Sequence, residues 1–180
     1  MKKIFAVLMV VFFVVFQLSA QEPSFVKGSK VLNLGVGLGA FHPGSYYKTT
    51  VPPVSASVDI GIVDGILEKA AVGVGPYIGY SASKWEFSGY GWKYNDIIIG
   101  ARGTFHYPFV DKLDTYAGVL LGYNITSSTE IGTVVGTPDG GHFVHSEFIG
   151  ARWYFTDSFA AFAELGYGIS WFTGGIALKF

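Results

Sequence analysis

The chain has 180 residues, which suits one domain, and its formal net charge of −1 gives no basic field for nucleic acid, so no nucleic-acid partner is expected. Half of the residues are hydrophobic and only 14% are charged, against about a quarter in soluble globular proteins. The absence of cysteine excludes disulfides, thiolate zinc sites and thiol catalysis.

Residues 1–20 have the organisation of a secretory signal peptide. Two lysines form a basic start, an unbroken apolar run covers residues 4–16, and Ala20 offers a small residue for cleavage. The run is shorter than the ~20 apolar residues that a membrane-spanning helix needs, which disfavours an uncleaved anchor. We therefore expect residues 21–180 to form the exported domain.

From residue 30 onward the dominant pattern is a period of two, which is typical of β-strands. In residues 30–40, leucine and valine alternate with asparagine and glycine. The alternation recurs in seven further segments, at 54–62, 72–80, 96–107, 116–124, 149–155, 161–168 and 171–180. The sequence therefore predicts an all-β domain of eight strands.

The predicted connections alternate in length. Long connections are expected at 42–52, 82–92 and 126–141, and shorter ones near 63–69, 108–113, 156–158 and 169–170. Long loops on one side and tight turns on the other are typical of an antiparallel up-and-down barrel with both termini on the turn side. Pro76 conflicts with its strand because proline cannot donate to the ladder, so a bulge is expected there.

The bulky apolar face is predicted to face lipid, because the interior of an eight-stranded barrel is just wide enough for side chains. Asp59, Arg102, Arg152 and Glu164 lie mid-strand on the opposite, glycine-rich face, and the outward face is free of charge through the strand centres. We expect these four to form an ion-pair network filling the lumen, with Arg152 and Glu164 close together across the short turn between their strands. A gate or proton path is the alternative interpretation. Large residues predicted to fill the same interior are Tyr77, Tyr116, Tyr154, Phe162 and Trp171.

Outward-facing aromatic residues gather at both ends of the predicted strands, as in the interface girdles of membrane barrels. In lipid, a closed sheet also satisfies every backbone N–H and C=O internally. The turn-side set is Phe105, Tyr107, Trp153, Phe155, Phe159 and Phe180, and the loop-side set is Tyr80, Tyr123, Tyr167 and Phe172.

The C-terminal segment, residues 173–180, carries the most specific resemblance. Its pattern of a polar residue, a glycine, a hydrophobic residue and a terminal aromatic residue is similar to the insertion signal of the small eight-stranded outer-membrane proteins of OmpA and OmpX type, the porin-family barrels. The resemblance implies a Gram-negative outer-membrane protein, with both termini periplasmic, that contacts membrane lipid and lipopolysaccharide. It also implies that the barrel-assembly machinery reads Gly175, Leu178 and Phe180, and that the last strand closes against the first. We expect a monomer.

No catalytic, cofactor or metal site is predicted. The glycines of residues 35–39 alternate along a strand rather than opening a helix, as a phosphate-binding loop must. His145, Ser146 and Glu147 are consecutive, but a strand places Ser146 on the face opposite the other two, so they cannot form a triad alone.

The predicted loops combine aromatic and basic residues that suit contact with a surface partner or with lipopolysaccharide at the rim. Three functions are considered for the predicted barrel, the last two because of the family that it resembles. The leading one is a structural or surface-interaction barrel with a side-chain-filled lumen; the others are a narrow pore for ions or small solutes and a lipid A-modifying enzyme. The candidate contact residues are Tyr46, Tyr47, Lys48, Trp85, Tyr90 and Trp92, with Lys84 and Lys93 beside them.

Overall fold

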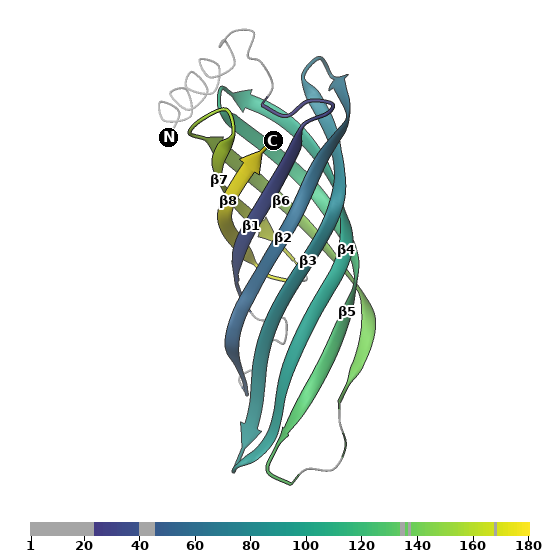
Figure 1. Ribbon diagram of the computed structural model, residues 1–180, viewed down its shortest axis with the longest axis vertical. Helices are drawn as coiled ribbons and strands as arrows, with labels where there is room; N and C mark the ends of the chain where they lie inside the picture. Colours follow the sequence, from purple (N-terminus) through teal and green to yellow (C-terminus); the bar gives the residue numbers. More distant parts are fainter. Residues whose placement is uncertain (1–23, 40–45, 134–135, 137, 168) are drawn as a thin grey trace, which may run out of the picture.

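Eight antiparallel strands form a closed barrel in which each strand pairs with its neighbours in sequence and the last pairs with the first (Figure 1). The computed structural model describes residues 24–39, 46–133, 136, 138–167 and 169–180, so the predicted signal peptide lies outside the described residues. The predicted eight-stranded up-and-down barrel is confirmed. The strands are β1 (Lys30–Leu38), β2 (Tyr47–Ile66), β3 (Ala70–Phe87), β4 (Tyr90–Val110), β5 (Leu113–Ile131), β6 (Gly140–Tyr154), β7 (Phe159–Gly166) and β8 (Phe172–Lys179).

The two ends of the barrel differ. Connections 67–69, 111–112 and 155–158 lie at one end, called the turn side, and the other connections lie at the opposite end, called the loop side. The C-terminus belongs to the turn side, where Phe180 N donates to Lys30 O at the start of β1 over 3.0 Å. Pairing of β8 with β1 thus closes the cylinder at the end of the chain, as expected.

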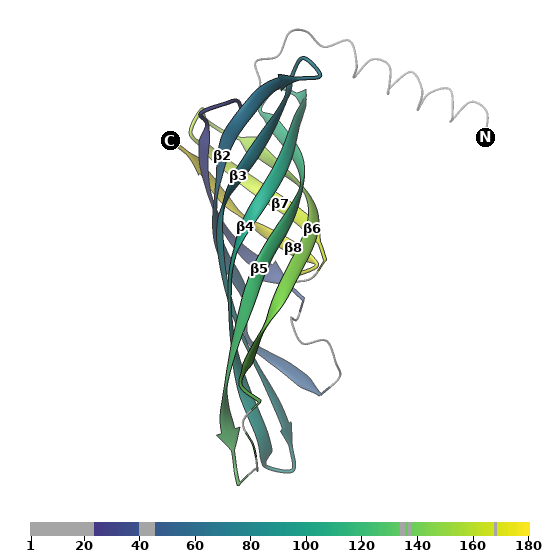
Figure 2. The ribbon, with the colours of Figure 1, turned by 90° about the vertical axis from the view of Figure 1, so that its right-hand side faces the viewer.

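Strands β2 to β5 extend past the rest of the barrel on the loop side (Figure 2). We call their protruding part, residues 47–53, 81–87, 90–97 and 124–131, the loop-side sheet. The predicted loop at 82–92 is wrong, because β3 and β4 stay paired up to a two-residue turn at Ser88 and Gly89. Both turn residues have positive φ, as a type I′ hairpin requires.

The wrong loop prediction has a physical cause. The protruding strands carry polar, aromatic and basic side chains in place of an apolar stripe, so the apolar alternation disappears, although tryptophan, tyrosine and threonine still favour strands. For the same reason β5 continues to Ile131 and the predicted loop at 126–141 shortens to 132–139.

Pro76 does not produce the predicted bulge. Pairing of β3 with β4 runs through Pro76, opposite Ala101, without a register shift. The β2–β3 ladder omits the pairs at Gly75 and Pro76 but keeps its register, and its shifts lie at 49–54 and 61–66. The missing N–H therefore interrupts the ladder locally instead of adding a residue to one strand.

The apolar face of the strands points outward and the polar face points inward, as predicted. Leu121 is 67% exposed, whereas the charged side chains of Asp59, Arg102 and Arg152 are at most 4% exposed. No helix among the described residues is long and apolar enough to cross a membrane.

Both predicted aromatic girdles lie on the outer surface, where Phe109 and Phe143 add to them. Trp171 is the exception among the residues predicted to fill the lumen. It is 65% exposed, because β8 begins only at Phe172 and Trp171 belongs to the preceding connection.

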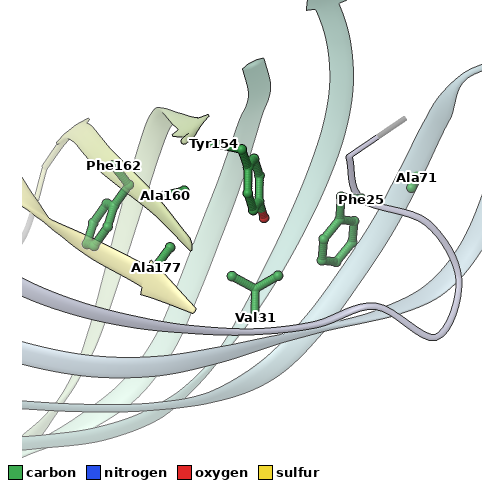
Figure 3. Packing of buried hydrophobic residues seen from close by; sticks show 7 residues of the cluster. All are labelled: Phe25, Val31, Ala71, Tyr154, Ala160, Phe162 and Ala177. Carbon is green, nitrogen blue, oxygen red and sulfur yellow. The ribbon is translucent and has the colours of Figure 1, made fainter. Parts of the chain in front are cut away.

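Two apolar clusters pack inside the barrel. In the turn-side cluster, the side chains of Phe25, Val31 and Tyr154 converge from the segment before β1, from β1 and from β6 (Figure 3). The loop-side cluster contains Ile98, Tyr116, Leu120, Phe148 and Ile169.

Candidate functional site

Arg152 on β6 is the centre of a polar network inside the lumen. Its Nε donates to Asn33 Oδ1 over 2.9 Å, its Nη1 donates to Asp114 Oδ2 over 2.8 Å, and its Nη2 pairs with Asp59 Oδ2. The guanidinium also lies 4.5 Å from the centre of the Tyr116 ring. One fully buried side chain thus ties together β1, β2, β5 and β6.

Arg102 on β4 forms a second node toward the loop side. Its Nη2 donates to Glu164 Oε1 over 2.6 Å and its Nη1 donates to Ser57 Oγ over 3.1 Å. The hydroxyl of Tyr116 donates to the same Glu164 oxygen over 2.8 Å. The guanidinium lies 4.2 Å from the Phe148 ring centre, so Arg102 both forms an ion pair and packs against an aromatic ring.

Arg152 and Glu164 are diagonal neighbours on β6 and β7, as predicted, but among the described residues no ion pair joins them. The register places Arg152 opposite Phe162, and Glu164 opposite Gly150. Glu164 is instead bonded by Arg102, which reaches it across the lumen from β4. Tilted strands in a narrow barrel bring together side chains from opposite walls, so sequence neighbourhood does not decide the pairs.

Several members of the network were not among the predicted site residues. His106 Nδ1 lies 2.8 Å from Asp114 Oδ1, and its Nε2 lies 2.9 Å from Thr104 Oγ1. Asn33 Nδ2 donates to Ser57 Oγ over 3.3 Å and so joins the two arginine nodes. Except for Asp114, these residues lay on the predicted inward faces, which was the available signal. Asp114 fell between a predicted turn and a predicted strand.

Glycines opposite aromatic residues let the rings fill the interior. Tyr116 lies opposite Gly150 and Phe148 lies opposite Gly118 in the β5–β6 ladder. A Cβ added at Gly150 would lie 2.6 Å from the Tyr116 ring, and one at Gly118 would lie 2.5 Å from the Phe148 ring. Aromatic rings covering cross-strand glycines stabilise sheets and account for the glycine-rich inward face.

The lumen is covered on the turn side by the segment that precedes β1. Phe25 is 2% exposed and stacks on His106, with ring centres 3.8 Å apart. Lys179 Nζ donates to Ser24 O over 2.8 Å, and Gly28 N donates to Gly61 O over 2.9 Å, which fixes the segment. No sequence signal indicated that Phe25 covers the lumen, because the segment before β1 precedes the first period-two segment.

The loop side of the lumen is covered by Ile169, which the connection between β7 and β8 inserts into the loop-side cluster. A small cavity of about 30 Å³ remains beside Arg102 and Glu164. This volume suits one or two waters.

The residues of the predicted insertion signal have structural roles in the barrel. Gly175 faces inward, where an added Cβ would lie 2.0 Å from Leu34 O and 2.8 Å from the Phe162 ring. Leu178 and Phe180 face outward near the turn side.

The predicted loop contacts are divided between the two faces of the loop-side sheet. Trp85 and Trp92 stack on its inner face with ring centres 5.5 Å apart, and Tyr47 lies next to them, opposite Trp85. Lys48 lies on the outer face, and Tyr46 and Tyr90 are exposed near the tips.

His145 and Glu147 point outward and Ser146 points inward, as the strand pattern predicted. His145 Nδ1 lies 2.9 Å from Glu147 Oε1, while Ser146 is buried. Glu147 lies opposite Val119, outside the predicted strand at 149–155, and places a carboxylate on the outward face. The carboxylate is near the loop-side rim, because Tyr167 N donates to Glu147 O and Tyr167 belongs to the girdle. The described residues contain no group of three side chains suited to hold a metal ion.

The chain is similar to the N-terminal β-barrel domain of Pseudomonas aeruginosa OprF, with 13% identity, a TM-score of 0.52, and coverage of 86% of this chain and 98% of that domain. The chain has the fold of an outer-membrane β-barrel. The barrel is also similar to Ail, the attachment invasion locus protein of Yersinia pestis, solved with the heparin analogue sucrose octasulfate, at 8% identity and a TM-score of 0.46 over 86% of this chain and 97% of that one. No protein-family model matches the barrel, and no curated protein sequence is significantly similar to it.

Proposed function

We propose that the chain is an integral outer-membrane protein whose closed barrel holds the loop-side sheet outside the cell, with both termini in the periplasm. The observation that carries this proposal is the distribution of side chains. Exposed apolar residues surround the barrel between two aromatic girdles, while the arginines and most carboxylates of the strand centres lie inside. A soluble barrel would place the apolar side chains in its interior.

The proposed role is structural or interactive rather than transport. Phe25 and Ile169 cover the two ends of the lumen, and Arg102, Arg152 and Tyr116 fill its centre. Water-filled pores occur in barrels with many more strands. A narrow pore would need these side chains to move together.

The partners we propose are outer-membrane lipid and lipopolysaccharide around the barrel and the barrel-assembly machinery during insertion, and we propose that the protein acts as a monomer. A lipid-modifying enzyme is less well supported, because the hydroxyl nearest in sequence to the His145–Glu147 pair belongs to Ser146 and points into the lumen.

Single-channel recording after reconstitution into a planar bilayer tests the closed lumen. We expect no steady openings from the wild-type protein, nor from Phe25→Ala, because the arginine network still fills the centre. A porin of known conductance verifies the bilayer. Steady wild-type openings whose ion selectivity changes in Arg102→Gln would show current through the lumen and would support the pore instead.

A further inference from the structure

Three lysines lie side by side on the outer face of the loop-side sheet. Lys48 of β2 is directly opposite Lys84 of β3, and Lys84 is directly opposite Lys93 of β4. The strand pairing therefore places three ammonium groups in one row across three neighbouring strands. We call these residues the lysine row.

The lysine row is electrostatically unfavourable without an anion. Directly opposed residues have Cβ atoms about 5 Å apart, and like charges in that arrangement destabilise a sheet. Glu86 offsets part of the charge, since its Oε2 accepts from Lys84 Nζ over 3.0 Å. Within the described part of the chain, neither Lys48 nor Lys93 forms an ion pair.

The position of the row relative to the apolar band identifies the source of the anion. Going toward the loop side, the outer face passes from Ile99 to Tyr80, whose hydroxyl donates to Asn95 Oδ1 over 2.9 Å, and then to Lys84 and Lys93. Apolar, aromatic, neutral polar and basic residues thus follow one another in the order of the layers of a lipid leaflet.

The distances agree with this order. Lys84 follows the girdle residue Tyr80 by four positions, or about 14 Å along the strand and roughly 10 Å along the membrane normal at the usual strand tilt. The headgroup region adds about 5–8 Å to each side of the hydrocarbon core. Because lysine side chains extend toward polar interfaces, the ammonium groups can reach headgroup phosphates from this position.

We propose that the lysine row binds the phosphate groups of phosphorylated lipid headgroups in the outer leaflet. This assignment rests on the proposed membrane location. Multiple ammonium groups in one row suit a headgroup that carries more than one phosphate, since each phosphate can accept charge-assisted hydrogen bonds from two neighbouring lysines.

The test is a titration of the detergent-solubilised protein with diphosphoryl lipid A, followed by native mass spectrometry. The triple variant Lys48→Gln, Lys84→Gln, Lys93→Gln is expected to bind about tenfold more weakly, as the loss of three exposed ion pairs predicts. The matched control is Lys27→Gln, Lys69→Gln, Lys112→Gln, which makes the same charge change on the turn side and should bind like wild type. Glu86→Gln should bind more tightly, because it frees Lys84.

Two further ligands separate the sources of phosphate. Lipid A stripped of its phosphates should bind wild type and triple variant equally weakly, and inorganic pyrophosphate should compete only poorly with the lipid. Equal binding of diphosphoryl lipid A by the triple variant and wild type would overturn the proposal, as would full competition by pyrophosphate. If the triple variant inserts into vesicles and binds diphosphoryl lipid A like wild type, only the proposal that the lysine row binds phosphate is overturned. If the wild-type protein fails to insert into vesicles, the proposed function itself is overturned.

Discussion

Replacing Arg152 by methionine is expected to lower the free energy of unfolding by about 3–5 kcal/mol, because removing one partner of a buried ion pair leaves uncompensated charge. Arg152 is fully buried and bonds both Asp59 and Asp114. In the variant, the carboxylates of Asp59 and Asp114 would remain buried in a narrow lumen without the Arg152 guanidinium that pairs with both. Urea unfolding of the protein in lipid vesicles, followed by tryptophan fluorescence, measures the loss.

Compensating variants show whether Arg152 stabilises the barrel through its charge or through its packing. Arg152→Met combined with Asp59→Asn and Asp114→Asn removes the charges on both sides and should recover most of the lost stability. Arg152→Lys should be intermediate, because a lysine keeps the charge but cannot reproduce the fork of donors. A single Arg152→Met variant as stable as wild type would show that the network does not hold the barrel together.

Replacing Gly175 by valine is expected to destabilise the barrel by about 3 kcal/mol, at the upper end of the usual cost of overpacking. The added Cβ would lie 2.0 Å from Leu34 O and 2.8 Å from the Gly35 Cα, so the backbone at the β1–β8 closure must move. The fraction of protein that refolds into lipid vesicles, read from the gel mobility of unheated samples, measures the effect without any assembly machinery.

The matched control is the adjacent residue, Gly174, on the outward face of the same strand. A Cβ there would meet the Phe172 ring at 3.3 Å and the Phe162 carbonyl oxygen at 3.8 Å, so Gly174→Val should cost about 0.5 kcal/mol or less. Equal losses from the two variants would mean that the strand needs glycine for a reason other than the packing of the closure.

The sequence predicted the parts of the fold that depend on alternation. The number of strands and the inward position of Arg102 and Arg152 follow from a period of two combined with the cost of charge in lipid. The closing of the last strand against the first was expected from the family resemblance. The loop-side hairpin of β3 and β4 was not predicted, because neither of its faces carries an apolar stripe.

The contacts of the site depend on geometry that a single sequence does not encode locally. The pairing of Arg102 with Glu164 depends on the tilt and register of strands on opposite walls. The stacking of Phe25 on His106 depends on a segment that has no alternation of apolar and polar residues. The lysine row became visible only when three separate strands were placed in register.

Surface labelling of single-cysteine variants in intact Gram-negative cells tests the central claim most directly, because the chain has no cysteine of its own. A membrane-impermeant maleimide should label Thr133→Cys, in the loop-side connection, and should label Asp157→Cys, in a turn-side connection, only after the cells are broken. Equal labelling of both positions in intact cells, or recovery of the protein in the soluble fraction, would contradict a barrel that spans the outer membrane with its termini inside.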